Sequence, residues 1–375
     1  MVPYLTDHFG NPSSAHRFGQ RARAGLDEAR ERVAKNLGAQ AREVVFTSGG
    51  TEANNLALKG AAWAGKARGH RIVTSAIEHH AVGHTLQHLE KFGFEIVELP
   101  VDRYGRVDPD EVEASITEKT ILVSVMLANN EVGTIEPITA IAERVHRHRG
   151  VLLHTDAVQA APYLDIDVGT LGADLLSISA HKVEGPKGVG VLYVRHGTHL
   201  LAQQHGGTQE RYRRAGTENV AGAVGLAAAY ELACRERPET TKRLRRLRDR
   251  LSTAILELEG TELTGHPKAR LPHLLSIIAR DVDGGEVALS LDLIDEIACS
   301  VGSACTSGSA EVSHVLSAMG YPDEEARGAL RLSLGRTTTD AEIDVACELV
   351  PRAVLVAREA NATPAGDLLG QGVGA

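Results

Sequence analysis

The chain has 375 residues, more than one ordinary hydrophobic core requires, and this length predicts two domains. Aromatic residues make up only 3% of it, which favours close-packed α/β layers over a β-sandwich. The net charge of −9 argues against direct nucleic-acid binding, and no apolar stretch is long enough to span a membrane. Four cysteines without CxxC spacing argue against a disulfide framework, so we expect a cytoplasmic protein.

Strand-like and helix-like segments alternate from residue 43 to 195. The strand-like segments are short and rich in Val, Ile and Leu: Glu43–Ser48, Arg71–Ser75, Glu95–Leu99, Thr120–Leu127, Val151–His154, Asp174–Ser179 and Val189–Val194. Amphipathic stretches lie between several of them, at Ala53–Ala64, Ala81–Phe92 and Ile138–His148. This alternation predicts a mostly parallel, seven-stranded buried sheet that binds ligands at the carboxyl ends of its strands.

The remaining chain predicts a smaller α+β domain. Residues 220 to about 258 have a helical pattern, in which we expect Pro238 to break the helix near the domain boundary. The basic cluster Lys242–Arg250 alternates with leucines at helical spacing, which favours a solvated helix face over a binding patch. The expected strands are Leu274–Ala279, Leu293–Cys299 and Ala329–Ser333, and the expected helices are Gly285–Asp292, Ser309–Met319 and Asp340–Arg358. We therefore predict a large domain over 1–237, a small domain over 238–360 and a disordered tail over 361–375.

A glycine-rich turn, Phe46–Glu52, ends one strand and opens a helix. Gly50 would let the backbone approach an anion, the first helical N–H groups would donate to it, and Thr51 would add a hydroxyl. No lysine follows as in a nucleotide-binding P-loop, so a cofactor phosphate fits better than a triphosphate. An ordinary turn with Thr51 as the helix N-cap explains the same pattern.

Two later strand ends carry residues suited to an aldehyde cofactor. Asp156 would keep a pyridinium nitrogen protonated, and Gln159 would reach a ring oxygen, although Asp156 would also serve as a helix cap. Lys182 ends a strand-like stretch, where Schiff-base formation would remove the cost of an interior ammonium. Ser179 and His181 would donate to the phosphate. A surface His-Lys pair is the competing interpretation.

Three further residues are candidates for chemistry. His79 follows a strand at the same sheet edge, where an imidazole would lie over a flat ring and shuttle protons. Arg331, inside an apolar strand, needs a carboxylate partner from the protein or from a substrate. Cys305 lies among small residues, which favours a mobile nucleophile. Cys299 is the better candidate for a core cysteine.

Together these segments resemble the group I cysteine desulfurases of the nitrogen-fixation and iron–sulfur-assembly type, within the class V aminotransferase family. The resemblance runs from Gly10 to about Arg358. It is carried by Gly10–Ser14, Thr47–Glu52, Asn129–Glu131, His154–Gln159, Ser179–Lys182, Gly185–Gly188, Arg214–Thr217 and Ser303–Ser307. It implies the type I fold of pyridoxal-phosphate enzymes and removal of sulfur from L-cysteine to give L-alanine and a persulfide.

The resemblance also implies individual roles. Lys182 is expected to carry pyridoxal 5′-phosphate as a Schiff base, and Cys305 to accept the sulfur. By the same resemblance, the cofactor phosphate would be bound by Gly50, Thr51, Ser179 and His181, and the cofactor ring would be contacted by His79, Asp156, Asn130 and Gln159. The substrate carboxylate would be bound by Asn11 and Arg331, and the phosphate of a neighbouring subunit by Thr217. A homodimer follows, with an acceptor protein such as an iron–sulfur scaffold.

Alternatives remain open at this point. Relatives of this type deliver sulfur to iron–sulfur scaffolds, tRNA thiolation proteins and DNA phosphorothioation systems. No resident metal is expected, although Cys305 would also serve as a ligand of an iron–sulfur cluster shared with a partner. The chain begins about twenty residues into the family pattern, which allows a catalytically impaired sulfur-relay subunit. Another class V enzyme, such as a transaminase or a selenocysteine lyase, is the third interpretation.

Overall fold

The computed structural model describes residues 1–302 and 312–362, apart from the side chain at position 295. The chain divides into two compact units. Unit 1 comprises Met1–Asp102, Arg106–Asn129 and Ile135–Glu239, and unit 2 comprises Arg103–Gly105, Asn130–Thr134 and Thr240–Ala375. Cys305, the proposed sulfur acceptor, and the tail from residue 363 lie outside the described residues.

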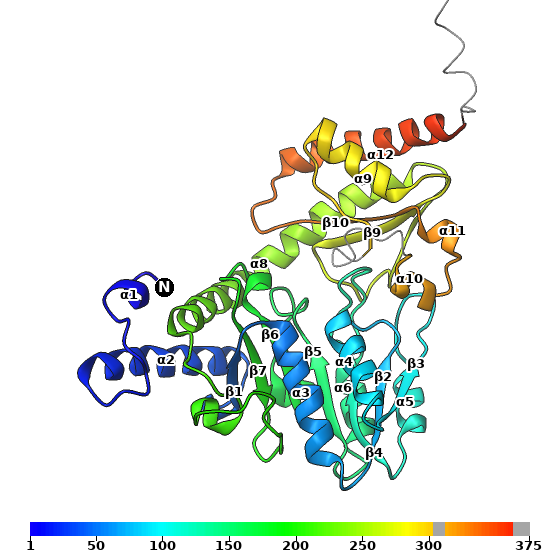
Figure 1. The fold of residues 1–375 in the computed structure, drawn as a ribbon. Coiled ribbons are helices and arrows are strands. Elements are labelled where there is room, and N and C mark those ends of the chain that lie inside the picture. Colours follow the sequence, from blue (N-terminus) through cyan, green and yellow to red (C-terminus); the bar gives the residue numbers. More distant parts are fainter. Residues whose placement is uncertain (303–311, 363–375) are drawn as a thin grey trace, which may run out of the picture. The chain divides into compact units, whose positions relative to one another are not determined.

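Unit 1 is built on one seven-stranded sheet with the order β1-β7-β6-β5-β4-β2-β3 (Figure 1). Its strands are β1 (Val44–Thr47), β2 (Arg71–Ser75), β3 (Glu95–Leu99), β4 (Thr120–Ser124), β5 (Leu152–Asp156), β6 (Leu175–Ser179) and β7 (Gly190–Val194). Only β7 runs antiparallel to its neighbours β1 and β6, so six of the seven strands are parallel. The predicted mostly parallel α/β sheet is confirmed.

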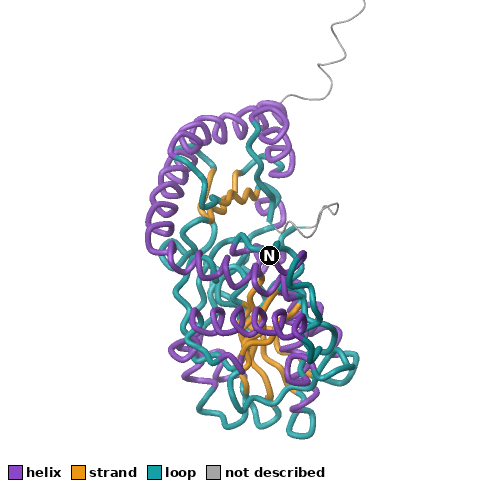
Figure 2. The backbone as a smooth tube through the Cα atoms, turned by 90° about the vertical axis from the view of Figure 1, so that its left-hand side faces the viewer, coloured by secondary structure: helices purple, strands orange, loops and turns teal. Residues whose placement is uncertain are grey.

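Helices cover both faces of this sheet. Every residue of β1, β4, β6 and β7 is buried, and because successive side chains point to opposite faces, neither face meets solvent there. Figure 2 shows the strands between helices. The helices of unit 1 before α8 are α1 (Pro3–Thr6), α2 (Arg17–Asn36), α3 (Gly50–Gly65), α4 (His80–Glu90), α5 (Pro109–Ser115), α6 (Ile138–Val145) and α7 (Val168–Leu171).

Small residues let α3 lie close to the middle of the sheet. Ala53, Leu56 and Ala57 are at most 2% exposed and belong to the same core cluster as Leu122 of β4 and Leu175 of β6. Alanine at this spacing gives the helix a narrow apolar face without breaking its backbone. The start of α3 is thereby fixed at the end of β1.

Unit 2 contains a three-stranded antiparallel sheet with the order β10-β9-β8. Its strands are β8 (Thr261–Leu263), β9 (Leu274–Ala279) and β10 (Ala329–Ser333), and its described helices beyond α8 are α9 (Gly284–Asp295), α10 (His314–Ala318), α11 (Asp323–Ala326) and α12 (Asp340–Ala362). β9 is fully buried, which makes it the centre of this smaller core. None of the described helices in either unit is long and apolar enough to cross a membrane.

The expected helix break at Pro238 is wrong. Helix α8 runs from Val220 to Leu256 with Pro238 inside it, and the two units divide between Glu239 and Thr240. Proline removes one helical hydrogen bond and costs about 3 kcal/mol in a helix interior. Both halves of α8 bury large side chains, with Tyr230 before the proline and Leu244 after it fully buried, and this packing offsets the cost.

The expected strand Leu293–Cys299 is also wrong. Asp283 accepts hydrogen bonds from the backbone N–H groups of Gly285 and Glu286 and starts α9, which continues to Asp295. Cys299 follows this helix in an irregular segment and is only partly buried. Burial and the charge of Asp292 raise the pKa of its thiol to about 11, so it stays protonated at neutral pH.

Candidate active site

Polar residues from several strands meet at one edge of the unit 1 sheet. The parallel strands β1, β5 and β6 end there with Thr47, Asp156 and Ser179. The antiparallel strand β7 begins at the same edge with Gly190, which pairs with both Thr47 and Ser179. Open α/β sheets bind their ligands at this edge, so these residues share the position of a binding site.

The glycine turn between β1 and α3 lies directly on the sheet. Gly49 has a φ of 153°, which favours glycine, and a Cβ on Gly50 would lie 2.7 Å from Val158 Cγ2 and 3.4 Å from Ser179 Cβ. A Cβ on Gly190 would lie 2.6 Å from the carbonyl carbon of Gly49. The first N–H groups of α3 have no partner within the helix, which makes this cradle suitable for a phosphate.

Ser179 and His181 form a polar pair beside the cradle. Ser179 Oγ lies 2.7 Å from His181 Nδ1. Burial, helped by the positive charges of Lys182 and Lys187, lowers the pKa of His181 below its ordinary value. A neutral imidazole and a hydroxyl therefore stand at this end of β6. One of their two protons lies in the hydrogen bond between them, which leaves the other to donate to an anion.

Lys182 does not end a buried strand as expected. β6 ends at Ser179, and Lys182 lies in the short 3-10 turn Ala180–Val183, where it is exposed. The chain leaves the sheet at Ala180 and turns, so the ammonium is not held in the interior. Access from solvent suits a lysine that must react with an incoming aldehyde.

Asp156 is the buried acid of the site. It is 6% exposed; Asn54 Nδ2 donates to its Oδ2 at 2.6 Å, and the N–H of Val158 donates to its Oδ1 at 2.9 Å. Burial raises its pKa, and the charges of His79 and Lys182 act in the opposite direction. A further positive charge, such as a protonated pyridine nitrogen, would stabilise the carboxylate here.

His79 is fixed as the N-cap of α4. The N–H of Ala81 donates to its Nδ1 at 3.0 Å, so a neutral ring carries its proton on Nε2. The residue before it, Glu78, accepts hydrogen bonds from Ser75 Oγ at 2.6 Å and from the N–H of Met126 at 2.8 Å. These contacts tie the His79 turn to the ends of β2 and β4.

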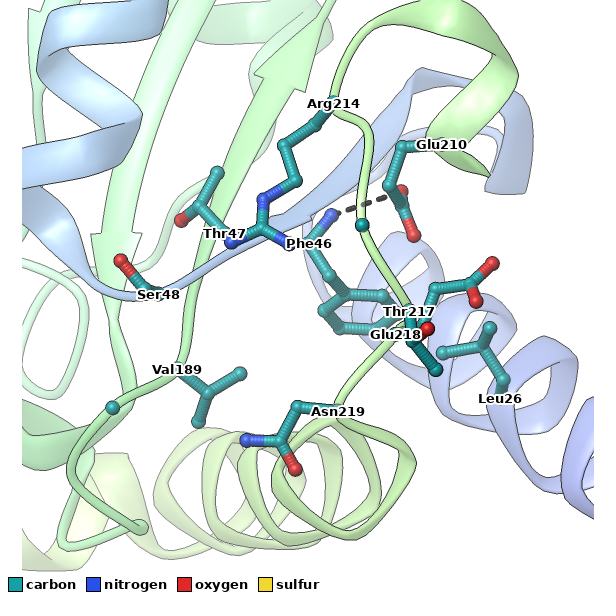
Figure 3. Close-up of a pocket in the computed structure, with 12 residues that line it drawn as sticks. Leu26, Phe46, Thr47, Ser48, Val189, Glu210, Arg214, Thr217, Glu218 and Asn219 are labelled. Carbon is teal, nitrogen blue, oxygen red and sulfur yellow. Dashed lines mark hydrogen bonds between the residues drawn. The ribbon is translucent and has the colours of Figure 1, made fainter. Parts of the chain in front are cut away.

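A cavity of about 140 Å³ lies beside the glycine turn (Figure 3). It is lined by Leu26, Phe46, Thr47, Ser48, Gly188, Val189, Glu210, Arg214, Gly216, Thr217, Glu218 and Asn219. Arg214 Nε donates to Glu52 Oε1 at 2.8 Å, which ties the segment carrying Thr217 to the first turn of α3. Burial opposes ionisation of Glu52, but the hydrogen bonds from Arg214 and Ser48 hold its pKa below the ordinary value. Thr217 is exposed at this cavity.

The other predicted residues are spread over both units. Asn11, which is exposed, and Gln159, which is half-buried, belong to unit 1. Asn130 and Arg331 belong to unit 2, where Arg331 Nη1 donates to the backbone carbonyl of Asn130 at 3.0 Å. Among the described residues, no group of three or more His, Cys, Asp or Glu side chains is arranged to hold a metal ion.

Comparison with known proteins decides the family. The model of the aminotransferase class-V family matches residues 1–345. The chain belongs to the class V aminotransferase family. A cysteine desulfurase IscS of Methanosarcina thermophila is 49% identical over 354 residues, covering 94% of this chain and 87% of the relative.

Solved structures agree with this family. A NifS-like protein matches with a TM-score of 0.89 and 37% identity, covering 95% of this chain and 94% of its own. A structure of SspA in complex with cysteine matches with a TM-score of 0.78 and 35% identity, covering 90% and 94% of the two chains. The type I fold, the cysteine-desulfurase class of enzyme and its dependence on pyridoxal phosphate, all expected from the sequence, are confirmed.

The described residues fit the cofactor. A Cβ would fill the cradle at Gly50, as expected where a phosphate approaches the backbone, and Asp156 is a buried carboxylate in need of a cation. Lys182 and His79 lie near enough to act electrostatically on Asp156. The three parts that pyridoxal phosphate needs, an anion cradle, a buried acid and a lysine, therefore occupy one edge of the unit 1 sheet.

Sequence reasoning missed Asn54 and the Glu52–Arg214 pair. Asn54 is 1% exposed in an alanine-rich helix, and a buried amide in such a helix needs a partner. That signal was available in the sequence, but it did not identify Asp156, which is 102 residues away, as the partner. The pairing of Arg214 with Glu52 depends on a long-range contact in the same way.

Proposed function

We propose that the enzyme removes sulfur from L-cysteine, releases L-alanine and stores the sulfur as a persulfide on Cys305. One observation carries this proposal: the Gly50 cradle, Asp156 and the Lys182 turn lie at the same edge of the sheet, in a chain that is related to cysteine desulfurases. The cradle suits the cofactor phosphate, the carboxylate of Asp156 suits the ring nitrogen, and the amine of Lys182 suits a Schiff base with the aldehyde.

Most of the groups that would hold the cofactor belong to unit 1. The N–H groups at Gly50 and Thr51 would bind the phosphate, together with Ser179 and His181, which already form a polar pair. Asp156, oriented by Asn54, would pair with the ring nitrogen. His79 would lie over the ring, while Gln159 and Asn130 would contact the ring oxygen.

When bound, pyridoxal phosphate supplies an electron sink that allows an amino acid to lose its Cα proton. Lys182 would accept this proton as an amine, once the substrate has taken its place on the cofactor. His79 is the second candidate for moving a proton, as a donor, because with Nδ1 accepting from Ala81 a neutral ring carries its proton on Nε2. Asn11 and Arg331 would bind the substrate carboxylate.

The sulfur step exchanges one bond for another. The thiolate of Cys305 attacks the sulfur of the bound cysteine, the Cβ–S bond breaks and an S–S bond forms. The carbon fragment takes up protons and leaves as alanine, so one cysteine and one enzyme thiol give one alanine and one enzyme persulfide. No outside oxidant or reductant is required until the persulfide is passed on.

We also propose that the enzyme is a homodimer in the cytoplasm and passes sulfur to an acceptor protein. Support for the dimer is Thr217, which is exposed at the cavity beside the glycine turn, where a second copy could use it. The described cysteines, Cys234, Cys299 and Cys347, are all free thiols, as is usual in a reducing compartment. Iron–sulfur scaffolds, tRNA thiolation proteins and DNA phosphorothioation systems are the candidate acceptors.

Two variants test the proposal. Cys305→Ala should abolish alanine formation from L-cysteine while the cofactor absorbance remains. Lys182→Ala should lose the absorption band of the lysine-bound cofactor and all activity. Alanine production by Cys305→Ala at the wild-type rate would reject Cys305 as the acceptor, and a normal absorption band in Lys182→Ala would reject the lysine.

A further inference from the structure

The outer edge of β1 is bound by a buried ion pair instead of another strand. β1 is the first strand in the order of the unit 1 sheet and pairs there with β7 alone. On its other side, Arg30 Nη1 donates to the carbonyl of Val44 at 2.8 Å. The N–H of Phe46 donates to Glu210 Oε2 at 3.0 Å. The ion pair therefore satisfies backbone groups that an edge strand would otherwise expose.

Arg30 and Glu210 form a two-point contact. Arg30 Nη1 donates to Glu210 Oε2 at 2.6 Å, and Arg30 Nη2 donates to Oε1 at 2.7 Å. Arg30 is 4% exposed and Glu210 is 5% exposed, so the pair is shielded from water. The guanidinium also lies 4.8 Å from the centroid of the Phe46 ring. Removing one charge alone would leave the other buried and unpaired.

The turn that carries Glu210 has an unfavourable backbone. Three successive residues are left-handed, with φ of 46° at Glu210, 57° at Arg211 and 65° at Tyr212. Residues with a Cβ rarely adopt this conformation in succession, and it persists only where the surrounding contacts impose it. The hydrogen bonds that the Glu210 carboxylate accepts supply such contacts and fix where the turn lies.

A second contact joins the same segment to the glycine turn. Arg214, four residues after Glu210, donates to both carboxylate oxygens of Glu52, at 2.8 and 3.2 Å. Glu52 Oε2 in turn accepts the N–H of Ser48 at 2.7 Å. Figure 3 shows Glu210 and Arg214 on one segment beside the end of β1. This segment therefore holds the chain at two points just before the glycine turn, and we call these two contacts the brace.

We propose that Glu210 is a positioning residue for the cofactor phosphate: together with Arg214, it braces the end of β1 and fixes the N–H groups of the glycine turn. The inference rests on the proposed binding of the phosphate at Gly50 and Thr51. Donors that already point at one place bind an anion more tightly, because the ligand does not have to order them. The brace should therefore raise affinity for the phosphate and leave the rest of the cofactor unaffected.

The test compares two ligands that differ in the phosphate. The full-length apoprotein is titrated with pyridoxal 5′-phosphate and with pyridoxal, and the absorbance of the Schiff base gives both affinities. The ratio of the two affinities measures the contribution of the phosphate. Arg214→Ala should lower this ratio about three- to tenfold, while affinity for pyridoxal stays at the wild-type value.

Two double variants test Glu210 without leaving a buried charge unpaired. In Arg30→Met/Glu210→Gln, the amide keeps an oxygen for the N–H of Phe46, and the ratio should stay at the wild-type value. In Arg30→Met/Glu210→Ala that oxygen is lost, and the ratio should fall about three- to tenfold. Both double variants lack the ion pair, so their difference reports the contact with β1.

Arg213→Ala is the matched control for Arg214→Ala. Arg213 precedes Arg214 on the same segment, and its Nη1 donates to the carbonyl of Arg42, before β1 begins. The ratio should therefore stay at the wild-type value. A fall equal to that in Arg214→Ala would overturn the brace, because any damage to the segment would then have the same effect.

A wild-type ratio in Arg214→Ala, or equal ratios in the two double variants, would overturn the brace and leave the proposed cofactor site standing. Equal losses of affinity for the two ligands would also overturn it, because the effect would then not concern the phosphate. If the wild-type protein itself binds pyridoxal as tightly as pyridoxal 5′-phosphate, the proposed phosphate cradle is rejected instead.

Discussion

The buried carboxylate of Asp156 depends on a side chain from a distant helix. Asn54 Nδ2 lies 2.6 Å from Asp156 Oδ2, and Asn54 is almost fully buried in the face of α3 that packs on the sheet. This contact fixes the direction of one carboxylate oxygen and leaves the carboxylate capacity for a cation. Asn54 therefore acts through Asp156 rather than on the substrate.

Replacing Asn54 by Ala should weaken cofactor binding about 10- to 100-fold, because a hydrogen bond to a buried charged group contributes about 1.5–3 kcal/mol. Titration of the apoprotein with pyridoxal phosphate, followed by absorbance, measures the change. Asn55→Ala is the matched control, since the neighbouring Asn55 donates to the backbone carbonyl of Thr51. Equal affinity in the two variants would contradict the assignment.

Two buried glutamates hold protons that an exposed glutamate would lose. Burial raises the pKa of Glu78 and of Glu136 to about 8, although each carboxylate accepts a backbone hydrogen bond, from Met126 and Val107 respectively. Between their ordinary pKa of 4.5 and about 8, each keeps its proton in the folded state and loses it in the unfolded state. Stability should therefore fall as the pH rises through this window and level off above it.

Glu136→Gln should flatten this pH dependence, because the amide is neutral at every pH. The reduction in slope should reach about 1.4 kcal/mol per pH unit between pH 5 and 8, measured by denaturant unfolding. The same substitution at the exposed Glu257 is the control. An unchanged slope in Glu136→Gln would show that this glutamate is already ionised in the folded state.

At this scale the sequence predicted where some candidate residues lie in the fold better than it predicted their environments. Asp156 and Ser179 were placed at strand ends from the pattern alone. The exposure of Lys182 was not predicted, because a four-residue turn after a strand leaves no clear signal in hydrophobic periodicity. The partners of Asp156 and Glu210 come from distant segments, which no local pattern reports.

Helix α8 carries a proline in its interior. Pro238 lies inside a helix of 37 residues and is exposed, so its side chain adds little packing to compensate for the missing N–H. Pro238→Ala should raise the free energy of unfolding by about 2 kcal/mol, after allowing for the greater entropy of the unfolded chain. Thermal and urea denaturation measure this. Pro109→Ala, in the first turn of α5 where proline is compatible, should give no gain.

The basic cluster of α8 is a set of contacts within unit 2. Arg246 and Arg250 pair with Asp340 and Asp344 of α12. Arg243 donates to the carbonyls of Arg336 and Thr338 just before that helix. The sequence correctly predicted that this cluster lies on a helix. It predicted a solvated face, however, and part of that face instead forms ion pairs with α12.

At the scale of the whole molecule, strand and helix alternation made unit 1 more predictable than unit 2. All seven strands of unit 1 were located from short runs rich in Val, Ile and Leu between turns, which is the pattern of strands in a largely buried, mostly parallel sheet. In unit 2 the short strand β8 was missed, and α9 was cut short, because its exposed Leu293 and Ile294 imitate a strand. Because Leu293 and Ile294 are exposed, they do not belong to the buried face of α9, and the helical periodicity of the sequence is lost at these positions.

A shared active site makes a test of the proposed dimer possible. Lys182→Ala removes the amine that would hold the cofactor in its own subunit, and Thr217→Ala removes a hydroxyl that would bind the phosphate in the other subunit. If each site combines Lys182 of one copy with Thr217 of the other, a mixed dimer of the two variants has one intact site. Co-expression should therefore restore up to half of the wild-type activity per mixed dimer. Activity that stays at the level of the separate variants would argue against a shared site.

Packing at Gly190 limits which amino acids this position can carry. A Cβ at this position would lie 2.6 Å from the carbonyl carbon of Gly49. Because the backbone fixes where a Cβ lies, no choice of rotamer relieves this clash. The position thus acts as a rigid floor under the phosphate turn, set by the single reversed strand of the sheet. In a saturation library of this gene, that codon should tolerate only glycine.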